Sequence, residues 1–391
     1  MCTLFGWPKP TGPYKVGLTT WLIADPSRLE PFQPGSAGPR EFMAHVWYPA
    51  QPGLKDDPLG GNVAFPEAGV WHPRPPVTLV MRQGALPDTL RQLIQRFNLP
   101  GLAYNQVTFV RAHAYPEAPM AEASAPYPVL VFSHDYWLEC ATSHTYLMEE
   151  LASHGYVVAS LSHPYESLAT VFPDGRLIGL DLANARIDSE RRWAQLQTLA
   201  QARSPLMEAS LQLWAADTHC LLDEIEKRNA AGSGDPLAGR LDVTRLGVLG
   251  VGFGGSVAGQ VCRNEPRCAA GLNIDGPQMP LGDVAEHPLK QPFMFVTSEA
   301  HQGMNAPIFE QAQRAAYQVT LRGVRPLDLT GAALWFPVLA ELAGFDGGRA
   351  YEAQRSLNAY CLAFFERHLR GLPAPLLEAG STAEVEIRFR E

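Results

Sequence analysis

Residues 246–256 read Leu-Gly-Val-Leu-Gly-Val-Gly-Phe-Gly-Gly-Ser, a short apolar strand followed by a glycine-rich turn and the start of a helix. The same strand–turn–helix order surrounds the nucleophile elbow, G-x-S-x-G, whose serine stands on the sharp turn. Gly250 and Gly254 match the two flanking glycines, and Gly252 takes the position of the serine. Since glycine has no side chain, no acyl-enzyme can form at residue 252. The window therefore predicts an elbow that lacks its nucleophile.

Apolar segments of strand length alternate with helical segments on both sides of this turn. Strands are expected at residues 41–48, 127–133, 156–161, 245–250, 269–274, 292–297 and 325–330, and helices at 142–154, 206–229 and 349–369. The later strands are continuous apolar runs, which is typical of a parallel sheet buried on both faces. The order predicts an α/β fold with a doubly wound, mostly parallel sheet.

Two further segments, residues 87–100 and 182–202, look like amphipathic helices outside this alternation. Such insertions often form a lid over a pocket at the ends of the strands. The chain shows no internal repeat and no composition break. We therefore expect a single domain over residues 1–391, with helical cap insertions at about 83–105 and 182–204.

Composition excludes several classes of partner. The 391 residues carry a net charge of −9 without a basic run, which disfavours nucleic acid and anionic membranes as partners. No apolar run reaches the roughly 18 residues that span a bilayer. The N-terminal residues lack the charged-then-apolar pattern of a secretory leader, so a cytoplasmic protein is expected. Whether the chain forms a homo-oligomer is left open.

The six cysteines show neither C-x-x-C nor metal-type spacing, so we expect reduced, buried thiols and no metal. Gly250, Gly252 and Gly255 fit the spacing of a G-x-G-x-x-G dinucleotide fingerprint. The window lies late in the chain, however, and an elbow explains the same glycines. No cofactor is expected.

Several other segments, in order along nearly the whole chain, carry a resemblance to a known family. They are residues 10–17, 40–50, 128–134, 149–158, 245–248 and 363–365. With the elbow, they resemble the plasma-type platelet-activating-factor acetylhydrolases and their bacterial relatives. The resemblance implies the α/β-hydrolase fold, and with it the helical cap.

The family has a Ser-Asp-His triad in that chain order. Carried over by position, the serine becomes Gly252 and the acid is Asp275, 23 residues further along the chain. The histidine position falls in residues 331–336, where Leu334 stands, and no histidine occurs between His301 and His368. The resemblance thus implies a degenerate triad that keeps only its acid.

The family's oxyanion hole consists of backbone N–H groups, which correspond to those of Tyr136 and Phe253. The family has glycine after Ser-His, whereas this chain has Asp135. A carboxylate there would repel a developing oxyanion. Aspartate also tolerates a positive φ better than most residues, so it can replace glycine in such a turn.

Asp135 and Asp275 are the main catalytic candidates, as general acids or bases. Without a histidine partner, a buried Asp275 should have a raised pKa; a structural aspartate held by backbone N–H groups is the alternative. For Asp135, the alternative to a role as general acid or base is that of a solvated residue in a turn. His134 is a third catalytic candidate, although the family fills its position for structural reasons.

The expected substrate pocket contains Trp137, Trp335, Phe336 and His163. Its aromatic side chains suit a hydrophobic or aromatic small molecule, although packing in the core is the ordinary role of such residues.

Ser256 and Cys262 are candidates for a relocated nucleophile, but both are expected to pack inside the fold. His301 is the one late histidine that a loop could bring to Asp275.

Three functions compete at this point. The first is non-hydrolytic acid–base catalysis (addition, elimination, isomerisation or cyclisation) on a hydrophobic metabolite in the former ester pocket. The second is a residual or rewired ester or lactone hydrolase. The third is a non-catalytic protein that binds a ligand or partner.

Overall fold

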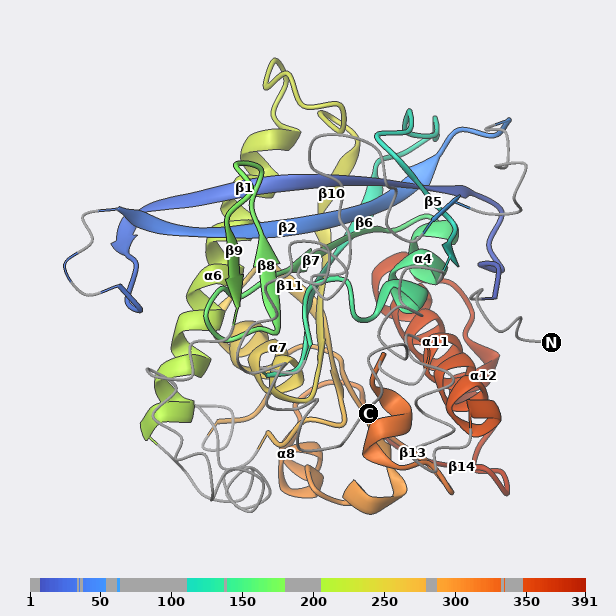
Figure 1. Ribbon diagram of the computed structural model, residues 1–391. Coiled ribbons are helices and arrows are strands. Elements are labelled where there is room, and N and C mark those ends of the chain that lie inside the picture. Colours follow the sequence, from blue (N-terminus) through green and yellow to red (C-terminus); the bar gives the residue numbers. More distant parts are fainter. Residues whose placement is uncertain are drawn as a thin grey trace.

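The computed structural model describes residues 8–33, 35, 38–53, 62–63, 111–136, 139–179, 205–278, 287–331, 334 and 347–391. The strands of its main sheet are β1 (Lys15–Leu29), β2 (Pro39–Ala50), β5 (Ala114–Pro116), β6 (Tyr127–Ser133), β7 (Val157–Leu161), β10 (Leu241–Val251), β11 (Cys268–Ile274), β12 (Phe293–Ser298), β13 (Ala316–Leu321) and β14 (Val385–Arg390). Their order is β14-β13-β12-β11-β10-β6-β7-β2-β1-β5 (Figure 1).

The six central strands, from β7 to β13 in this order, are all parallel, while β2 and β14 join them antiparallel. The chain passes from β6 to β7 on one side and later returns to β10 on the other side of β6. The strand order therefore reverses between β6 and β10, and such a switch point leaves a crevice at the carboxyl ends of the strands. The expected doubly wound, mostly parallel sheet is confirmed.

Helices cover both faces of the sheet. Helices α6 (Pro205–Asn229) and α7 (Phe253–Asn264) pack on one face, and α4 (Thr145–Ser153), α11 (Gly347–Arg370) and α12 (Pro375–Glu378) pack on the other (Figure 1). In α11 the apolar residues Leu357, Tyr360, Cys361, Phe364 and Phe365 recur at helical spacing, and all are buried. This stripe faces the sheet, which is why the segment forms a packed helix.

The remaining described elements are short. They are β3 (Asn62–Val63), β4 (Arg111–Ala112), β8 (Ala169–Val171), β9 (Leu177–Gly179), η3 (Glu299–His301), α8 (Ala306–Gln311) and η4 (Pro326–Leu329). The strand expected at residues 325–330 is wrong, because Pro326 begins the 3₁₀ helix η4 and the last parallel strand is the earlier β13. The cap insertions expected at about 83–105 and 182–204 lie outside the described residues.

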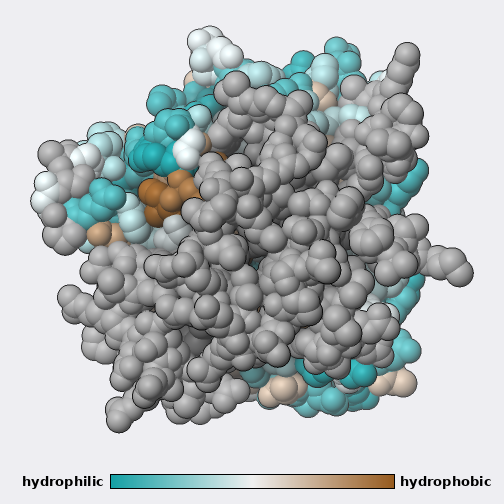
Figure 2. All heavy atoms as spheres, in the orientation of Figure 1, coloured by the Kyte–Doolittle hydropathy of each residue, from teal (hydrophilic) through white to brown (hydrophobic). Residues whose placement is uncertain are grey.

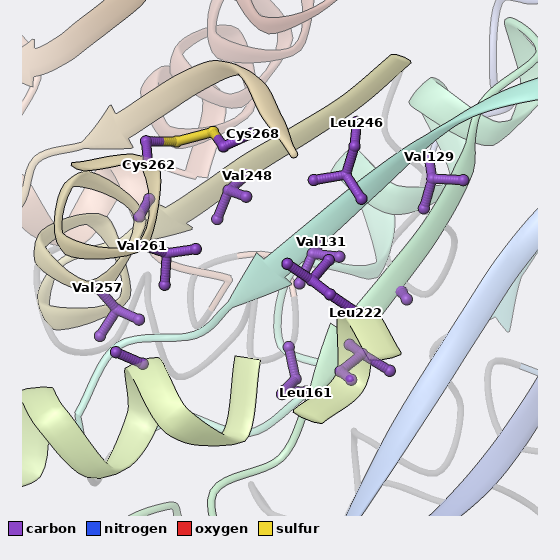
Figure 3. Packing of buried hydrophobic residues seen from close by; sticks show 14 of the residues in the cluster. Val129, Val131, Leu161, Leu222, Leu246, Val248, Val257, Val261, Cys262 and Cys268 are labelled. Carbon is purple, nitrogen blue, oxygen red and sulfur yellow. A yellow bond between two sulfur atoms is a disulfide. The ribbon is translucent and has the colours of Figure 1, made fainter. Parts of the chain in front are cut away.

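A disulfide closes the turn between α7 and β11. Figure 3 shows it beside the valine-rich core between α7 and β10, where Val248, Val257 and Val261 pack. Cys262 and Cys268 are joined with a Cα–Cα distance of 5.2 Å. The expectation of reduced thiols is wrong for this pair, because helix, turn and strand return the chain onto itself within six residues. Cys140, Cys220 and Cys361 are free.

Within the described part of the chain, no helix is long and apolar enough to cross a membrane. The same residues contain no group of three or more His, Cys, Asp or Glu side chains that could hold a metal ion. On the face seen in Figure 2, the coloured surface is mainly hydrophilic, with a small hydrophobic patch at upper left.

Candidate active site

The elbow lies at the switch point of the sheet. Strand β10 ends at Val251, helix α7 begins at Phe253, and Gly252 makes the turn between them with φ 55° and ψ −120°. The turn is packed closely against the end of β6, since a Cβ at Gly254 would overlap the carbonyl oxygen of Ser133. The flanking glycine is therefore required by packing, and the sharp turn of a nucleophile elbow is retained.

The side chain of Asp135 fills the space in front of Gly252. A Cβ added to Gly252 would overlap the Oδ1 and Cγ atoms of this carboxylate. Oδ1 accepts hydrogen bonds from the backbone N–H of Phe253 at 2.7 Å and of Tyr136 at 2.8 Å. The two amides expected to form the oxyanion hole thus converge on one oxygen atom, and that oxygen belongs to the protein.

Asp135 is poised to change its protonation state near neutral pH. Burial and the nearby Glu139 carboxylate raise its pKa to about 7, against the opposing effect of the two amides. Glu139 also accepts a hydrogen bond from the backbone N–H of Asp135 at 3.0 Å. Although burial opposes it, the contact with His144 at 2.9 Å holds the pKa of Glu139 below its ordinary value. The two carboxyl groups therefore differ in character, with Asp135 the more readily protonated.

Asp275 does have a histidine partner, which corrects the expectation that it stands alone. It follows β11 with φ 55°, and its Oδ1 accepts hydrogen bonds from the backbone N–H and the Oγ of Ser298 at 2.8 and 2.9 Å. Its Oδ2 lies 3.0 Å from Nδ1 of His301, which belongs to η3 directly after β12. The Asp275 carboxylate raises the pKa of His301, although burial partly opposes this effect.

The Asp275–His301 pair stands next to the elbow. The backbone N–H of Gly252 donates to the carbonyl oxygen of Ile274 at 2.8 Å, and a Cβ at Gly276 would overlap the Gly252 carbonyl oxygen. The His301 side chain is 39% exposed, and no described residue pairs with its Nε2. Among the described residues, Asp135 and the Asp275–His301 pair are thus ionisable groups that the fold brings next to Gly252.

Beneath the elbow, Ser133, His163 and Asp217 form a fully buried hydrogen-bonded chain. His163 Nδ1 lies 3.1 Å from Asp217 and its Nε2 lies 3.4 Å from Ser133 Oγ. The order resembles a catalytic triad, but the three residues are 3%, 0% and 0% exposed. The His163 ring is stacked on Trp214 at 3.8 Å, and burial lowers its pKa. These contacts favour a supporting role, and the assignment of His163 to the pocket stays a prediction.

His134 belongs to the same interior cluster. Its ring packs against Trp214 at 5.0 Å, and its Nδ1 lies 2.7 Å from the carbonyl oxygen of Asp135. Burial lowers its pKa to about 3, so the ring is neutral and donates to that carbonyl. The contact fixes the backbone that carries Asp135; a catalytic role for His134 stays a prediction.

A buried arginine, unmarked by any sequence motif, anchors this cluster to the sheet. Arg40 on β2 is 0% exposed and reaches Asp217 on α6 at 2.9 Å and Glu30 at 3.0 Å. Although burial opposes it, Arg40 and His163 hold the pKa of Asp217 well below its ordinary value. Asp217 and Arg40 are 177 positions apart, so only the fold reveals the pair.

The remaining candidates supply no nucleophile. Ser256 is fully buried and its Oγ donates to the carbonyl oxygen of Pro277 at 2.7 Å, as expected for a packed residue. Cys262 is held in the disulfide. Leu334 is buried and its backbone N–H donates to Gly331, so its assignment to the histidine position stays a prediction. The pocket candidates Trp137, Trp335 and Phe336 lie outside the described residues.

Comparison with known proteins agrees with this architecture. The model of the family described as "Platelet-activating factor acetylhydrolase, isoform II" matches residues 81–318. A platelet-activating factor acetylhydrolase from Cavia porcellus is 24% identical over 382 residues, which cover 93% of this chain and 78% of the relative. A solved ferulic acid esterase from Streptomyces cinnamoneus is 26% identical, with a TM-score of 0.69 and full coverage of both chains. The predicted resemblance is confirmed: the chain belongs to the platelet-activating factor acetylhydrolase isoform II family and has the α/β-hydrolase fold of an esterase.

Proposed function

We propose that the protein hydrolyses an ester, cyclic esters included, with the Asp135 carboxylate in the place of the missing serine. The observation that carries this proposal is the overlap between the Asp135 carboxylate and the position of a side chain at Gly252. A reactive oxygen is thereby retained at the elbow although its residue comes from another strand end. The esterase relatives support hydrolysis as the reaction class.

The Asp275–His301 pair takes the role of proton carrier in this proposal. A carboxylate beside an imidazole orients the ring and stabilises its protonated form. The partly exposed His301 ring can therefore move protons to and from water or the substrate oxygen. The rings of Tyr136 and Phe253, 5.3 Å apart, are buried and hold the backbone of the two amides in place.

A second candidate is non-hydrolytic acid–base chemistry on a hydrophobic metabolite, such as an addition, elimination, isomerisation or cyclisation. It is favoured by one observation: both converging amides already donate to Asp135, so they are not free to hold the oxyanion of an ester tetrahedral intermediate. A carboxyl group with a pKa of about 7 is well suited to such proton transfer.

The test is hydrolysis of a panel of aryl esters and lactones, together with labelling by a fluorophosphonate. Wild type should turn over at least one substrate without forming a fluorophosphonate adduct. Asp135→Asn should lower kcat/KM about 10²- to 10⁴-fold, the range for loss of an acid–base group. The matched control, Asp174→Asn, changes an exposed aspartate and should leave kcat/KM unchanged.

Two results would contradict the proposal. A stoichiometric adduct on a serine, lost together with activity when that serine is replaced, would show a conventional nucleophile. Absence of hydrolysis across the panel, with substrate consumed to a product that contains no added water, would favour the second candidate.

A further inference from the structure

We propose that Asp135 is a covalent nucleophile whose Oδ2 opens a β-lactone at its saturated ring carbon. The inference rests on the proposed function and specifies the substrate class and the bond that breaks. It follows from the different surroundings of the two carboxylate oxygens, and from the commitment of both converging amides to one of them.

Of the two carboxylate oxygens of Asp135, only Oδ1 accepts hydrogen bonds from described residues. It accepts the hydrogen bonds from Phe253 and Tyr136, whereas no described residue donates to Oδ2. Both oxygens lie close to the position of a Cβ at Gly252, and Oδ2 is 2.7 Å from it, so the second oxygen also lies at the turn of the elbow. A carboxylate with one oxygen fixed by two amides and the other unpaired is oriented for attack, because binding at Oδ1 sets the direction of Oδ2.

The same arrangement selects the carbon that is attacked. Attack on a carbonyl carbon creates an oxyanion that needs donors, and the two converging amides are already bound to Oδ1. Attack on the saturated ring carbon of a β-lactone instead releases a carboxylate. A carboxylate is stable at neutral pH without a proton or an oxyanion hole, since its ordinary pKa is about 4. Ring strain in the four-membered ring supplies the reactivity that an unstrained alkyl ester lacks.

The first step balances without a co-reactant. The electron pair of Oδ2 forms a bond to the ring carbon, and the ring C–O bond breaks with its pair on the departing oxygen. The product of this step is an ester between Asp135 and the opened substrate, which carries a free carboxylate.

The second step uses the His301 imidazole and the same two amides. Neutral His301 takes a proton from water, and the resulting hydroxide attacks Cγ of Asp135. The negative charge then develops on Oδ1, where the N–H groups of Phe253 and Tyr136 already point. The Cγ–Oδ2 bond breaks, and Oδ2 leaves with the substrate as an alcohol that takes the proton from His301. Asp135 is left as a carboxylic acid that contains one oxygen from water, and it becomes a carboxylate again when it releases this proton to solvent.

Two readouts follow for an enantiopure β-butyrolactone. Attack at the saturated carbon inverts its configuration, and hydrolysis at Cγ leaves it unchanged, so the (R)-lactone should give (S)-3-hydroxybutyrate. In a single turnover in H₂¹⁸O with enzyme in excess, the product should contain no ¹⁸O. The peptide that carries Asp135 should instead gain about 2 Da, located on this residue by fragmentation.

The matched variants are Asp135→Asn and Asp174→Asn. The first should lower lactone hydrolysis at least about 100-fold, and the second should behave as wild type in rate and in labelling. An epoxide that carries a nitrophenyl group, which alkylates reactive carboxylates, should form an adduct on Asp135 of wild type. This adduct tests nucleophilicity even where lactone turnover is slow.

Three outcomes would overturn the covalent role. Retention of configuration with ¹⁸O in the product carboxylate would show acyl cleavage, and inversion with ¹⁸O in the product hydroxyl would show direct attack by water. In both cases ester hydrolysis as a function would stand. Failure of wild type both to open the lactone and to form the epoxide adduct would reject the nucleophile, and the aryl ester panel would then decide the proposed function by itself.

Discussion

A serine introduced at residue 252 should destabilise the protein unless Asp135 is removed as well. In Gly252→Ser, the new Cβ overlaps the Asp135 carboxylate, which must leave its two amides. Each hydrogen bond to a charged group contributes about 1.5–3 kcal/mol, and a non-glycine residue in a sparsely populated φ/ψ region costs about 1–3 kcal/mol. Partial hydration of the released groups reduces the sum, so we expect a loss of about 3–5 kcal/mol in the free energy of unfolding.

The double variant isolates the steric conflict. Gly252→Ser and Asp135→Gly each lose the same two hydrogen bonds, and the double variant loses them only once. Urea unfolding should therefore show the double variant to be about 3 kcal/mol more stable than the two single effects predict by addition. Asp174→Gly, combined with Gly252→Ser, is the additive control. Additivity within about 0.5 kcal/mol in the test pair would refute the overlap of the two side chains.

Three further predictions concern ionisation, the disulfide and the buried ion pair. Because burial and a neighbouring carboxylate raise the pKa of Asp135 to about 7, its anionic form grows as the pH rises through this value. The pH profile of kcat/KM should rise there in wild type. The folded state holds this proton more tightly than the unfolded chain. Ionisation of Asp135 therefore lowers the free energy of unfolding: the loss is absent below the ordinary pKa of 3.8 and complete above about 7. Replacing Cys262 and Cys268 by alanine should lower the free energy of unfolding by about 2 kcal/mol, the loop entropy of a six-residue closure, as measured in urea against wild type with its disulfide intact. Asp217→Asn removes one of the two carboxylates that pair with the buried Arg40 and should cost about 3–5 kcal/mol in the same assay; a loss under 1 kcal/mol would contradict the pairing.

The fold was predictable because its signals are local. The elbow window and the continuous apolar runs of β6, β10 and β11 identify buried parallel strands from a few residues each. Strand β13 was misplaced because its buried face includes Gln318 and Thr320, which interrupt the apolar pattern although both are only 3% exposed. The assignment of this strand therefore failed where polar residues are buried, since hydrophobic periodicity contains no information about hydrogen-bonded partners.

The site was less predictable because its pairs join distant segments. Asp135 was singled out by its departure from the family pattern, but its position in front of Gly252 depends on how closely β6 and β10 pack. His301 was considered only as a residue that a loop could bring to Asp275. Its pairing arises because η3 follows β12 directly, and β12 is the neighbour of β11. The sequence gives the order of site residues along the chain, whereas the order of strands in the sheet decides which of their side chains meet.

The changes at residues 135 and 252 are one structural feature. A carboxylate at residue 135 occupies the volume of any side chain at 252, so glycine at the elbow is a steric requirement of Asp135 and not a simple loss. Conversely, with glycine at 252 and no acceptor in front of it, the amides of Phe253 and Tyr136 would lack the oxygen to which both now donate. Asp135 therefore requires glycine at residue 252, and its carboxylate satisfies the two amides beside that glycine. The two converging amides hold a carboxyl group whose pKa is raised to about 7, and an aspartate–histidine pair lies at the neighbouring strand end; this concentration of ionisable groups is the physical argument for the chemistry proposed at the elbow.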